Sequence, residues 1–215
     1  MKIGVFDSGV GGAAITKELE IFFPKATILT INDTRHVPYG NKSQDEVIHL
    51  TNLAIKPLLK ERCDIIVIAC NTATALAIDY LREHYPWQKF IGIEPMVKAA
   101  AMQTKSNVIA VCATPATLES KNYQRLKTAF AQNITIIEPD CSRWALMIQD
   151  NTLSEDQIRI AIEPCLKKGA DVIVLGCTHY HWIKDYIASI TKDQAVVLEP
   201  SKAIAKRIRQ LLQAV

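Results

Sequence analysis

The sequence predicts an α/β fold made of two similar halves, each a doubly wound parallel sheet. The first observation is that short apolar runs rich in β-branched residues alternate with segments of helical period. The second is an internal repeat, in which residues 64–72 recur as 171–179 at an offset of 177 − 70 = 107 in a chain of 215 residues. The third is that both copies of this stretch end a buried-type strand with a cysteine and small polar residues.

Eight apolar runs are expected to be strands. Their spacing by segments of helical period favours parallel βαβ units over hairpins. The first four runs also align with the last four, since residues 3–6 correspond to 109–112 and residues 93–95 to 198–200. A duplication that gives two domains related by a pseudo-two-fold axis explains this pattern. The expected strands are 3–6, 27–31, 65–69, 90–93, 108–111, 134–137, 172–175 and 196–198.

The first domain is expected to hold residues 1–98 together with 205–215, and the second residues 99–204. A polar stretch at 103–106 interrupts the apolar pattern near the first boundary, and the last helix is expected to pack back on the first domain. Because ligands of open α/β sheets bind beyond the carboxyl ends of the strands, we expect the active site in a cleft between the two domains.

Composition excludes several classes of protein. Hydrophobic residues make up 49% of the chain, and the net charge of +3 comes without the basic stripe of a nucleic-acid surface. No apolar run approaches the roughly 20 residues of a spanning helix, and the amino terminus has no signal-peptide pattern. We expect a cytoplasmic protein with no membrane or nucleic-acid partner, in which the six cysteines stay reduced.

Cys70 and Cys177 differ from the other four cysteines by their position. Cys63, Cys112, Cys141 and Cys165 suit the usual role of a small buried hydrophobe. Cys70 and Cys177 each stand where a strand ends and a helix begins, and the helix dipole there favours the thiolate. A thiolate at such a place is a nucleophile, a metal ligand or a base.

Two cysteines at equivalent places indicate a task with two sides. Removing a proton from one face of a carbon and returning it to the other is such a task, with one residue starting as thiolate and the other as thiol. The ordinary thiol pKa of about 8.5 makes both forms accessible. His179 is the candidate to assist Cys177, and Asp7 the candidate to assist Cys70.

Two other interpretations of the sequence are a dinucleotide site and a metal site. The turn Gly9-x-Gly11-x-x-Ala14 fits the dinucleotide pattern, with Asp33 where a ribose-binding acid would lie. It leaves the duplicated cysteines unexplained. Cys177, His179 and His181 form a possible metal site, but C-x-H-x-H is not a usual zinc spacing and no second ligand cluster completes it. We therefore favour neither a bound nucleotide nor a metal.

Hydroxyl and amide side chains gather at the expected strand ends and helix starts. Neutral donors at helix amino termini suit the carboxylates of a small substrate. The loop after the second strand adds a turn whose backbone is restrained by a proline and a glycine. The candidate binding residues from this pattern are Ser8, Asn71, Thr72, Thr114, Thr117 and Thr178.

Five motifs, in order along nearly the whole chain, resemble those of bacterial glutamate racemases in the aspartate/glutamate racemase family. They are residues 6–12 (FDSGVGG), 37–43 (VPYGNKS), 69–73 (ACNTA), 92–95 (GIEP) and 176–180 (GCTHY). The resemblance implies cofactor-independent racemisation by two bases, in which Cys70 removes the α-proton of D-glutamate and Cys177 that of L-glutamate. It also implies assistance by Asp7 and His179 and substrate binding by Pro38, Tyr39 and Gly40 together with the residues above. It further implies a homodimer and D-glutamate destined for peptidoglycan.

The chain departs from the family pattern at three places. A glutamate usual in the family falls at Met147-Ile148-Gln149-Asp150, the usual Pro-Leu is His181-Trp182, and an expected Asp-Ser-Gly is Glu199-Pro200-Ser201. Two alternatives therefore stay open. One is a racemase of aspartate or another acidic amino acid, and the other is a racemase-like binding protein with a dormant site.

Overall fold

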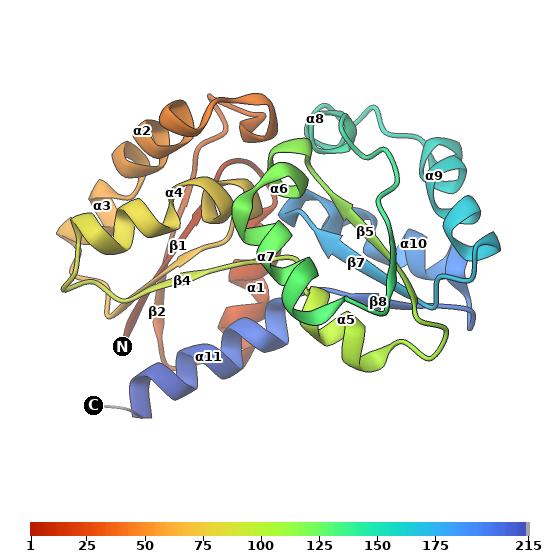
Figure 1. Ribbon diagram of the computed structural model, residues 1–215. Coiled ribbons are helices and arrows are strands. Elements are labelled where there is room, and N and C mark those ends of the chain that lie inside the picture. The colour runs from red at the N-terminus through yellow and green to blue at the C-terminus, as the bar shows by residue number, and fades with distance from the viewer. Residues whose placement is uncertain (214–215) are drawn as a thin grey trace. The chain divides into compact units, whose positions relative to one another are not determined.

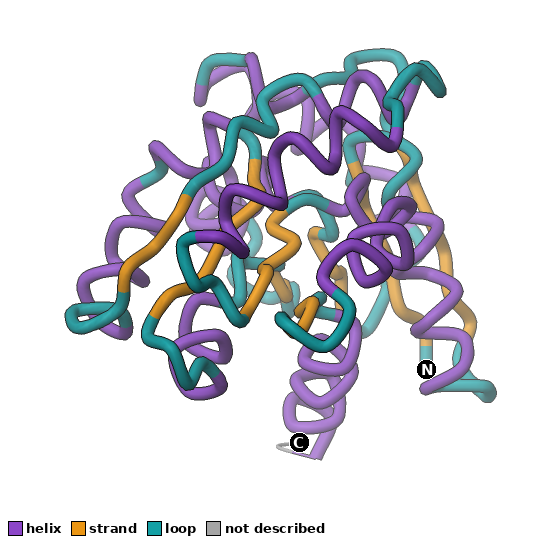
Figure 2. Tube along the Cα trace, turned by 90° about the vertical axis from the view of Figure 1, so that its right-hand side faces the viewer, coloured by secondary structure: helices purple, strands orange, loops and turns teal. Residues whose placement is uncertain are grey.

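The computed structural model describes residues 1–213, which divide into two compact units. Unit 1 holds Met1–Glu94 and the chain from Pro200 onward, and unit 2 holds Pro95–Glu199. Strands and helices alternate in both, as the trace in Figure 2 shows with strands in orange and helices in purple. The predicted α/β class is confirmed.

Unit 1 contains a parallel sheet in the order β2-β1-β3-β4. Its strands are β1 (Lys2–Asp7), β2 (Thr27–Asn32), β3 (Ile65–Ile68) and β4 (Phe90–Gly92). Every residue of β3 is buried, because helices cover both faces of the sheet at this central strand. This explains why its sequence is continuously apolar instead of alternating.

Helices pack on both faces of the first sheet (Figure 1). One face packs against α2 (Gln44–Ala54), α3 (Lys56–Lys60) and α4 (Asn71–His84), around side chains such as Phe6 and Ile68. The other face packs against α1 (Gly12–Phe22) and α11 (Ser201–Gln213). A short 3-10 helix, η1 (Tyr39–Asn41), lies in the loop after β2.

Unit 2 repeats the arrangement with the sheet order β6-β5-β7-β8. The strands are β5 (Val108–Ala113), β6 (Thr135–Ile137), β7 (Val172–Gly176) and β8 (Val196–Leu198). All pairings are parallel, as in unit 1. The common strand order confirms the two similar parallel sheets that the internal repeat predicted.

The helices of unit 2 also form two layers (Figure 1). One face of the sheet packs against side chains of α8 (Trp144–Gln149), α9 (Glu155–Lys167), η2 (Thr178–Ile183) and α10 (Lys184–Thr191). The other packs against α5 (Val97–Gln103), α6 (Pro115–Glu119) and α7 (Lys121–Phe130).

The boundaries between the units fall earlier than the sequence analysis placed them. They lie at 94/95 and 199/200 instead of 98/99 and 204/205. Both follow the last strand of a sheet, and the next helix belongs to the other unit. Val97 of α5 lies in the core of unit 2, whereas Ile204 of α11 lies in the core of unit 1. The polar stretch at 103–106 is tied into unit 2, where Asp171 accepts hydrogen bonds from three of its residues.

The helices are short, and the longer ones include α4 with 14 residues. Within residues 1–213, none combines the length and the apolar character that crossing a membrane demands.

Thr74 ties the start of α4 to the sheet of unit 1. Its Oγ1 donates to the carbonyl of Ile68 on β3 and accepts from the Ile93 N–H, each at 3.0 Å. A Cβ added at Gly92 would lie 2.5 Å from the Thr74 methyl carbon. Gly92 therefore allows this close approach of helix and strand.

We predict that Gly92→Ala lowers the free energy of unfolding by about 1–3 kcal/mol, because the added methyl group overpacks this contact. Urea unfolding followed by circular dichroism measures the change. The double variant Gly92→Ala with Thr74→Ser, which removes the clashing methyl group and keeps the hydroxyl, should regain part of the loss. Equal stability of the parent and Gly92→Ala would contradict the prediction.

Candidate active site

Asp7, Ser8 and Cys70 meet at the carboxyl edge of the first sheet. Asp7 is the last residue of β1, and Cys70 follows β3, the parallel strand beside it. The Ser8 hydroxyl donates to Cys70 Sγ at 3.0 Å. Asp7 is fully buried and Cys70 is 5% exposed. The predicted grouping of these residues in unit 1 is therefore present.

Cys70 caps the amino terminus of α4, with Sγ accepting the Ala73 N–H at 3.3 Å. We expected the helix start to favour the thiolate, and hydrogen bonds from Ser8, Ala73 and Thr72 do lower the pKa. Burial and the charge of Asp7 outweigh them, so that the pKa of Cys70 is raised to about 11. The expected direction of the pKa shift was wrong, because the free-energy cost of desolvating the thiolate exceeds the stabilisation that the helix start provides.

Asn71 and Thr72 lie in the first turn of α4, each 3% exposed. Neither Oδ1 nor Nδ2 of Asn71 has a hydrogen-bond partner among the described residues, although both atoms are buried. A buried polar group without a partner costs roughly 1–3 kcal/mol. This amide is therefore suited to hold a polar ligand beside Cys70.

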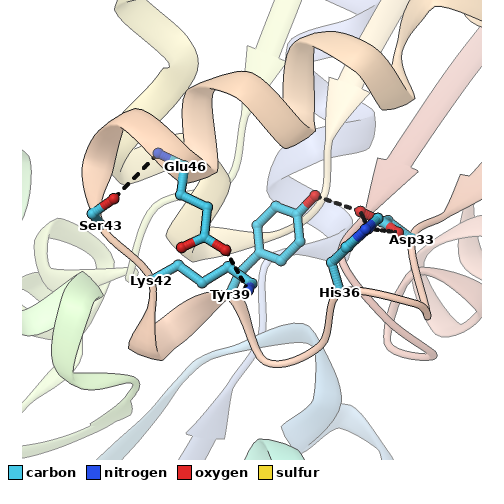
Figure 3. A network of polar contacts seen from close by, with 6 residues as sticks. All are labelled: Asp33, His36, Tyr39, Lys42, Ser43 and Glu46. Atoms are coloured by element: carbon cyan, nitrogen blue, oxygen red, sulfur yellow. Dashed lines mark hydrogen bonds and ion pairs between the residues drawn. The ribbon is translucent and has the colours of Figure 1, made fainter.

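Tyr39 belongs to a polar network in the loop after β2 (Figure 3). Its hydroxyl donates to Asp33 Oδ2 at 2.8 Å, and His36 Nδ1 lies 2.8 Å from Asp33 Oδ1. Burial and Asp33 raise the pKa of Tyr39, so the hydroxyl stays protonated and donates a hydrogen bond to Asp33. The Tyr39 ring lies 6.3 Å from that of Phe6. The side chain of Tyr39 thus orders this loop.

The same loop holds Pro38 and Gly40. Pro38 has an extended backbone before η1, and Gly40 is buried within it. The loop then leads into α2, where Ser43 Oγ accepts the Glu46 N–H and Lys42 pairs with the Glu46 carboxylate at 2.7 Å (Figure 3). These contacts fix the loop at both ends.

The glycine turn after β1 has a packing explanation. A Cβ added at Gly12 would lie 2.5 Å from Asp7 Cβ and 2.6 Å from Asn32 Oδ1. The absence of a side chain lets α1 approach β1 and β2 closely. Asp33, the acid that the dinucleotide interpretation required, is engaged with His36 and Tyr39.

Cys177 and Thr114 stand at the carboxyl edge of the second sheet. Cys177 follows β7 and Thr114 follows β5, the adjacent parallel strand. Cys177 is 7% exposed, Thr178 and His179 are buried, and Cys177 Sγ lies 3.9 Å from His179 Nδ1. The hydroxyl oxygens of Thr114 and Thr117 are 3.0 Å apart. The predicted grouping is therefore present in unit 2 as well.

The two cysteines have different surroundings. Cys70 starts an α-helix and caps it, whereas Cys177 precedes the 3-10 helix η2 and makes no capping hydrogen bond. Cys70 has Ser8 and Asp7 beside it, whereas Cys177 has an imidazole. The repeat places the two thiols equivalently but gives each a separate partner.

Gln149 is a site residue that the sequence analysis did not include among its candidates. Its Oε1 lies 3.3 Å from His179 Nε2, on the side of the ring away from the nitrogen that faces Cys177. It is the last residue of α8. The only signal in the sequence was its place in the stretch where the family usually has a glutamate.

His181 lies outside the Cys177–His179 contact. Its Nδ1 is 3.9 Å from Glu199 Oε2, and burial lowers its pKa. Within residues 1–213, no three His, Cys, Asp or Glu side chains are grouped so that they could hold a metal ion. Cys63, Cys112, Cys141 and Cys165 are buried free thiols, and each lies in the core of its unit.

Comparison with known proteins decides the family. The sequence model described as Asp/Glu/hydantoin racemase matches residues 13–208 of the chain. The chain belongs to this racemase family. A glutamate racemase of Herpetosiphon aurantiacus is 38% identical over 216 residues, covering 99% of this chain and 85% of the relative. One of Ectopseudomonas mendocina is 36% identical, covering 98% and 81%.

Solved structures of this racemase family have the same fold. The Escherichia coli glutamate racemase, in complex with L-glutamate and the activator UDP-MurNAc-Ala, gives a TM-score of 0.88 at 27% identity, covering 99% of this chain and 82% of that one. The Francisella tularensis enzyme with D-glutamate gives 0.81 at 31% identity, covering 99% and 81%. The chain is therefore an amino-acid racemase, an isomerase.

We predict that Asp7→Asn in this racemase lowers the pKa of Cys70 by about one unit, because a negative charge that opposes the thiolate is removed. The pH dependence of Cys70 alkylation by iodoacetamide, followed by peptide mass spectrometry, measures the change. Alkylation should reach half its maximal rate at lower pH in the variant.

Asp79→Asn is the matched control for this titration. Asp79 lies on α4, the helix that Cys70 caps, but its side chain is almost fully exposed, so its charge is screened by water. The control should alkylate like the parent. An unchanged or higher midpoint in Asp7→Asn would show that Asp7 does not govern the thiol.

Proposed function

We propose that this racemase interconverts L- and D-glutamate without a cofactor, with Cys70 and Cys177 as the two bases. The observation that carries the proposal is the pair of buried cysteines at equivalent strand ends of two duplicated units, each beside a polar helper. Curated relatives over nearly the whole chain are named glutamate racemases, and related racemases have been solved in complex with L-glutamate and with D-glutamate.

The reaction needs one base on each face of the α-carbon. Cys70 as thiolate removes the α-proton of D-glutamate, and the carbanion then takes a proton from the Cys177 thiol to give L-glutamate. The reverse reaction begins at Cys177 and ends at Cys70. Each turnover leaves the two sulfurs with exchanged protonation states, so no other acid or base is consumed.

Asp7 and His179 assist the cysteines in different ways. With a pKa of about 11, Cys70 rests as the thiol at neutral pH. The substrate ammonium group, attracted by the buried carboxylate of Asp7, offsets the charge that opposes the thiolate, and the Cys70 proton passes to solvent when the thiolate forms. His179 Nδ1 exchanges a proton with Cys177 directly, since it faces Sγ.

The binding residues suit the two carboxylates of glutamate. The buried amide of Asn71 offers both a donor and an acceptor beside Cys70. Hydroxyl groups come from Ser8, Thr72, Thr114, Thr117 and Thr178, and the loop with Pro38, Tyr39 and Gly40 adds backbone groups. Since the Tyr39 hydroxyl donates its hydrogen bond to Asp33, we assign Tyr39 a contact with the substrate through its backbone.

The wider role follows from the product. We propose that the enzyme acts in the cytoplasm as a homodimer, and that its D-glutamate feeds peptidoglycan synthesis. The agreement with glutamate racemases over nearly the full chain supports this role.

The substrate assignment is tested by circular dichroism of enantiopure amino acids incubated with the enzyme. We predict that the signal of L-glutamate and that of D-glutamate both decay to zero, and that the signal of aspartate persists. Decay for aspartate alone would replace glutamate with the shorter acid. If the circular dichroism signal of every amino acid persisted, the protein would be a racemase-like binding protein with a dormant site.

The assignment of faces is tested with single cysteine variants in deuterated water. We predict that Cys70→Ala and Cys177→Ala each lose racemisation by roughly 10²–10⁴-fold, because one proton-transfer group is missing. Cys70→Ala should still exchange the α-proton of L-glutamate, and Cys177→Ala that of D-glutamate, which mass spectrometry measures.

Cys63→Ala is the control for these variants. Cys63 is buried in the core of unit 1 and is not assigned to the site, so the variant should racemise glutamate. Racemisation at the parent rate by Cys70→Ala or Cys177→Ala would remove that cysteine from the mechanism.

A further inference from the structure

In the contact between Gln149 and His179, the donor and the acceptor of the hydrogen bond can be assigned. The Gln149 oxygen that lies 3.3 Å from Nε2 is a carbonyl oxygen, which only accepts hydrogen bonds, so Nε2 carries the proton. In a neutral imidazole the other nitrogen, Nδ1, is then unprotonated and can accept a proton. That nitrogen faces Cys177 Sγ at 3.9 Å.

The segment that carries Gln149 is held firmly against η2. The Trp144 ring at the start of α8 packs edge-on against Tyr180, with centroids 5.4 Å apart. The Tyr180 hydroxyl donates to the carbonyl of Cys141, just before α8, at 2.9 Å. Both Trp144 and Tyr180 are buried. Gln149 is therefore held in place by the packing of its helix.

We propose that Gln149 is a positioning residue that keeps His179 neutral, with its proton on Nε2, so that Nδ1 is the proton acceptor for the Cys177 thiol. The catalytic consequence rests on the proposed function. Cys177 then rests as the thiol, ready to donate a proton to the carbanion, and becomes a base only by passing that proton to His179.

The amide differs from a carboxylate at this place by its charge. A carboxylate would also accept from Nε2, but it would stabilise the imidazolium and so favour the Cys177 thiolate. The amide gives the same geometry without that charge. Gln149 thereby sets the balance between the acid and base forms of Cys177, whereas Ser8, Asp7 and burial set that of Cys70.

The other ionisable groups near η2 in unit 2 are occupied elsewhere. Tyr180 points to the Cys141 carbonyl, and burial raises its pKa. His181 and Lys184 lie beside Glu199, each at 3.9 Å. Arg143 and Asp150, which flank α8, are exposed. Cys177 and Gln149 both lie in direct contact with His179.

The test uses nitrogen-15 NMR of the histidine rings in the full-length protein without substrate. The parent should show His179 as the Nε2–H tautomer. Gln149→Glu should raise the pH at which His179 titrates by about one unit, because the new carboxylate stabilises the imidazolium. Gln149→Met, which is similar in length but accepts no hydrogen bond from Nε2–H, should lose the tautomer preference. His179→Asn identifies the signals.

Kinetics supply a second readout. L- and D-glutamate have equal free energies in water, so kcat/KM must be the same in both directions for every variant. Gln149→Glu should therefore raise the ratio of kcat for L-glutamate to kcat for D-glutamate by up to about tenfold, the equivalent of one pH unit. The ratio of the two KM values should rise equally. A merely structural residue would lower both kcat values together.

Asp150→Asn is the matched control, since it changes the charge one residue away on an exposed side chain. It should leave the His179 titration and the kcat ratio unchanged. An unshifted titration in Gln149→Glu, an intact tautomer preference in Gln149→Met, or an equal effect of Asp150→Asn would each overturn the proposal.

The NMR readout separates this proposal from the proposed function. If the parent shows the Nε2–H tautomer and the expected shifts but leaves glutamate unchanged, the glutamate assignment fails and the role of Gln149 stands. If the parent racemises glutamate but the His179 titration and tautomer do not change with the residue at position 149, the glutamate assignment stands and the role of Gln149 fails.

Discussion

The burial of the two central strands is the constraint on which the structure depends. Every residue of β3 and of β7 is buried, and each strand delivers a cysteine to an edge that is also nearly closed to water. At Cys70 the loss of thiolate hydration costs more free energy than the helix start returns. The chemistry of both sulfurs is therefore set by the few polar groups that touch them.

Those groups differ between the two halves, although the strand order is the same. Ser8 donates to Cys70 while Asp7 opposes its ionisation, so the two neighbours act in opposite directions. Cys177 has instead an imidazole that either accepts or donates a proton. Duplication thus preserved the position of the thiol and let its protonation be governed separately on each side.

Much of the fold could be predicted from the sequence, because burial on both faces leaves continuous apolar runs. All eight strands lie within about two residues of the predicted ranges. The positions of Cys70 and Cys177 followed from the repeat. The contact of Gln149 with His179 could not be predicted, because it joins residues 30 apart and depends on how α8 packs on η2. The thiol form of Cys70 was missed because burial was weighed too lightly against the helix start.

The helices that follow β4 and β8 have an evolutionary consequence. Each is covalently attached to one sheet and completes the hydrophobic core beside the other, since Val97 is buried in unit 2 and Ile208 in unit 1. A half-length ancestor with one sheet and its terminal helix would have left that helix without its own core. In a dimer of two ancestral copies, each last helix could have packed into the hydrophobic core of the other subunit. In such an ancestry, fusion of the two genes would have turned a reciprocal exchange between subunits into a feature of one polypeptide.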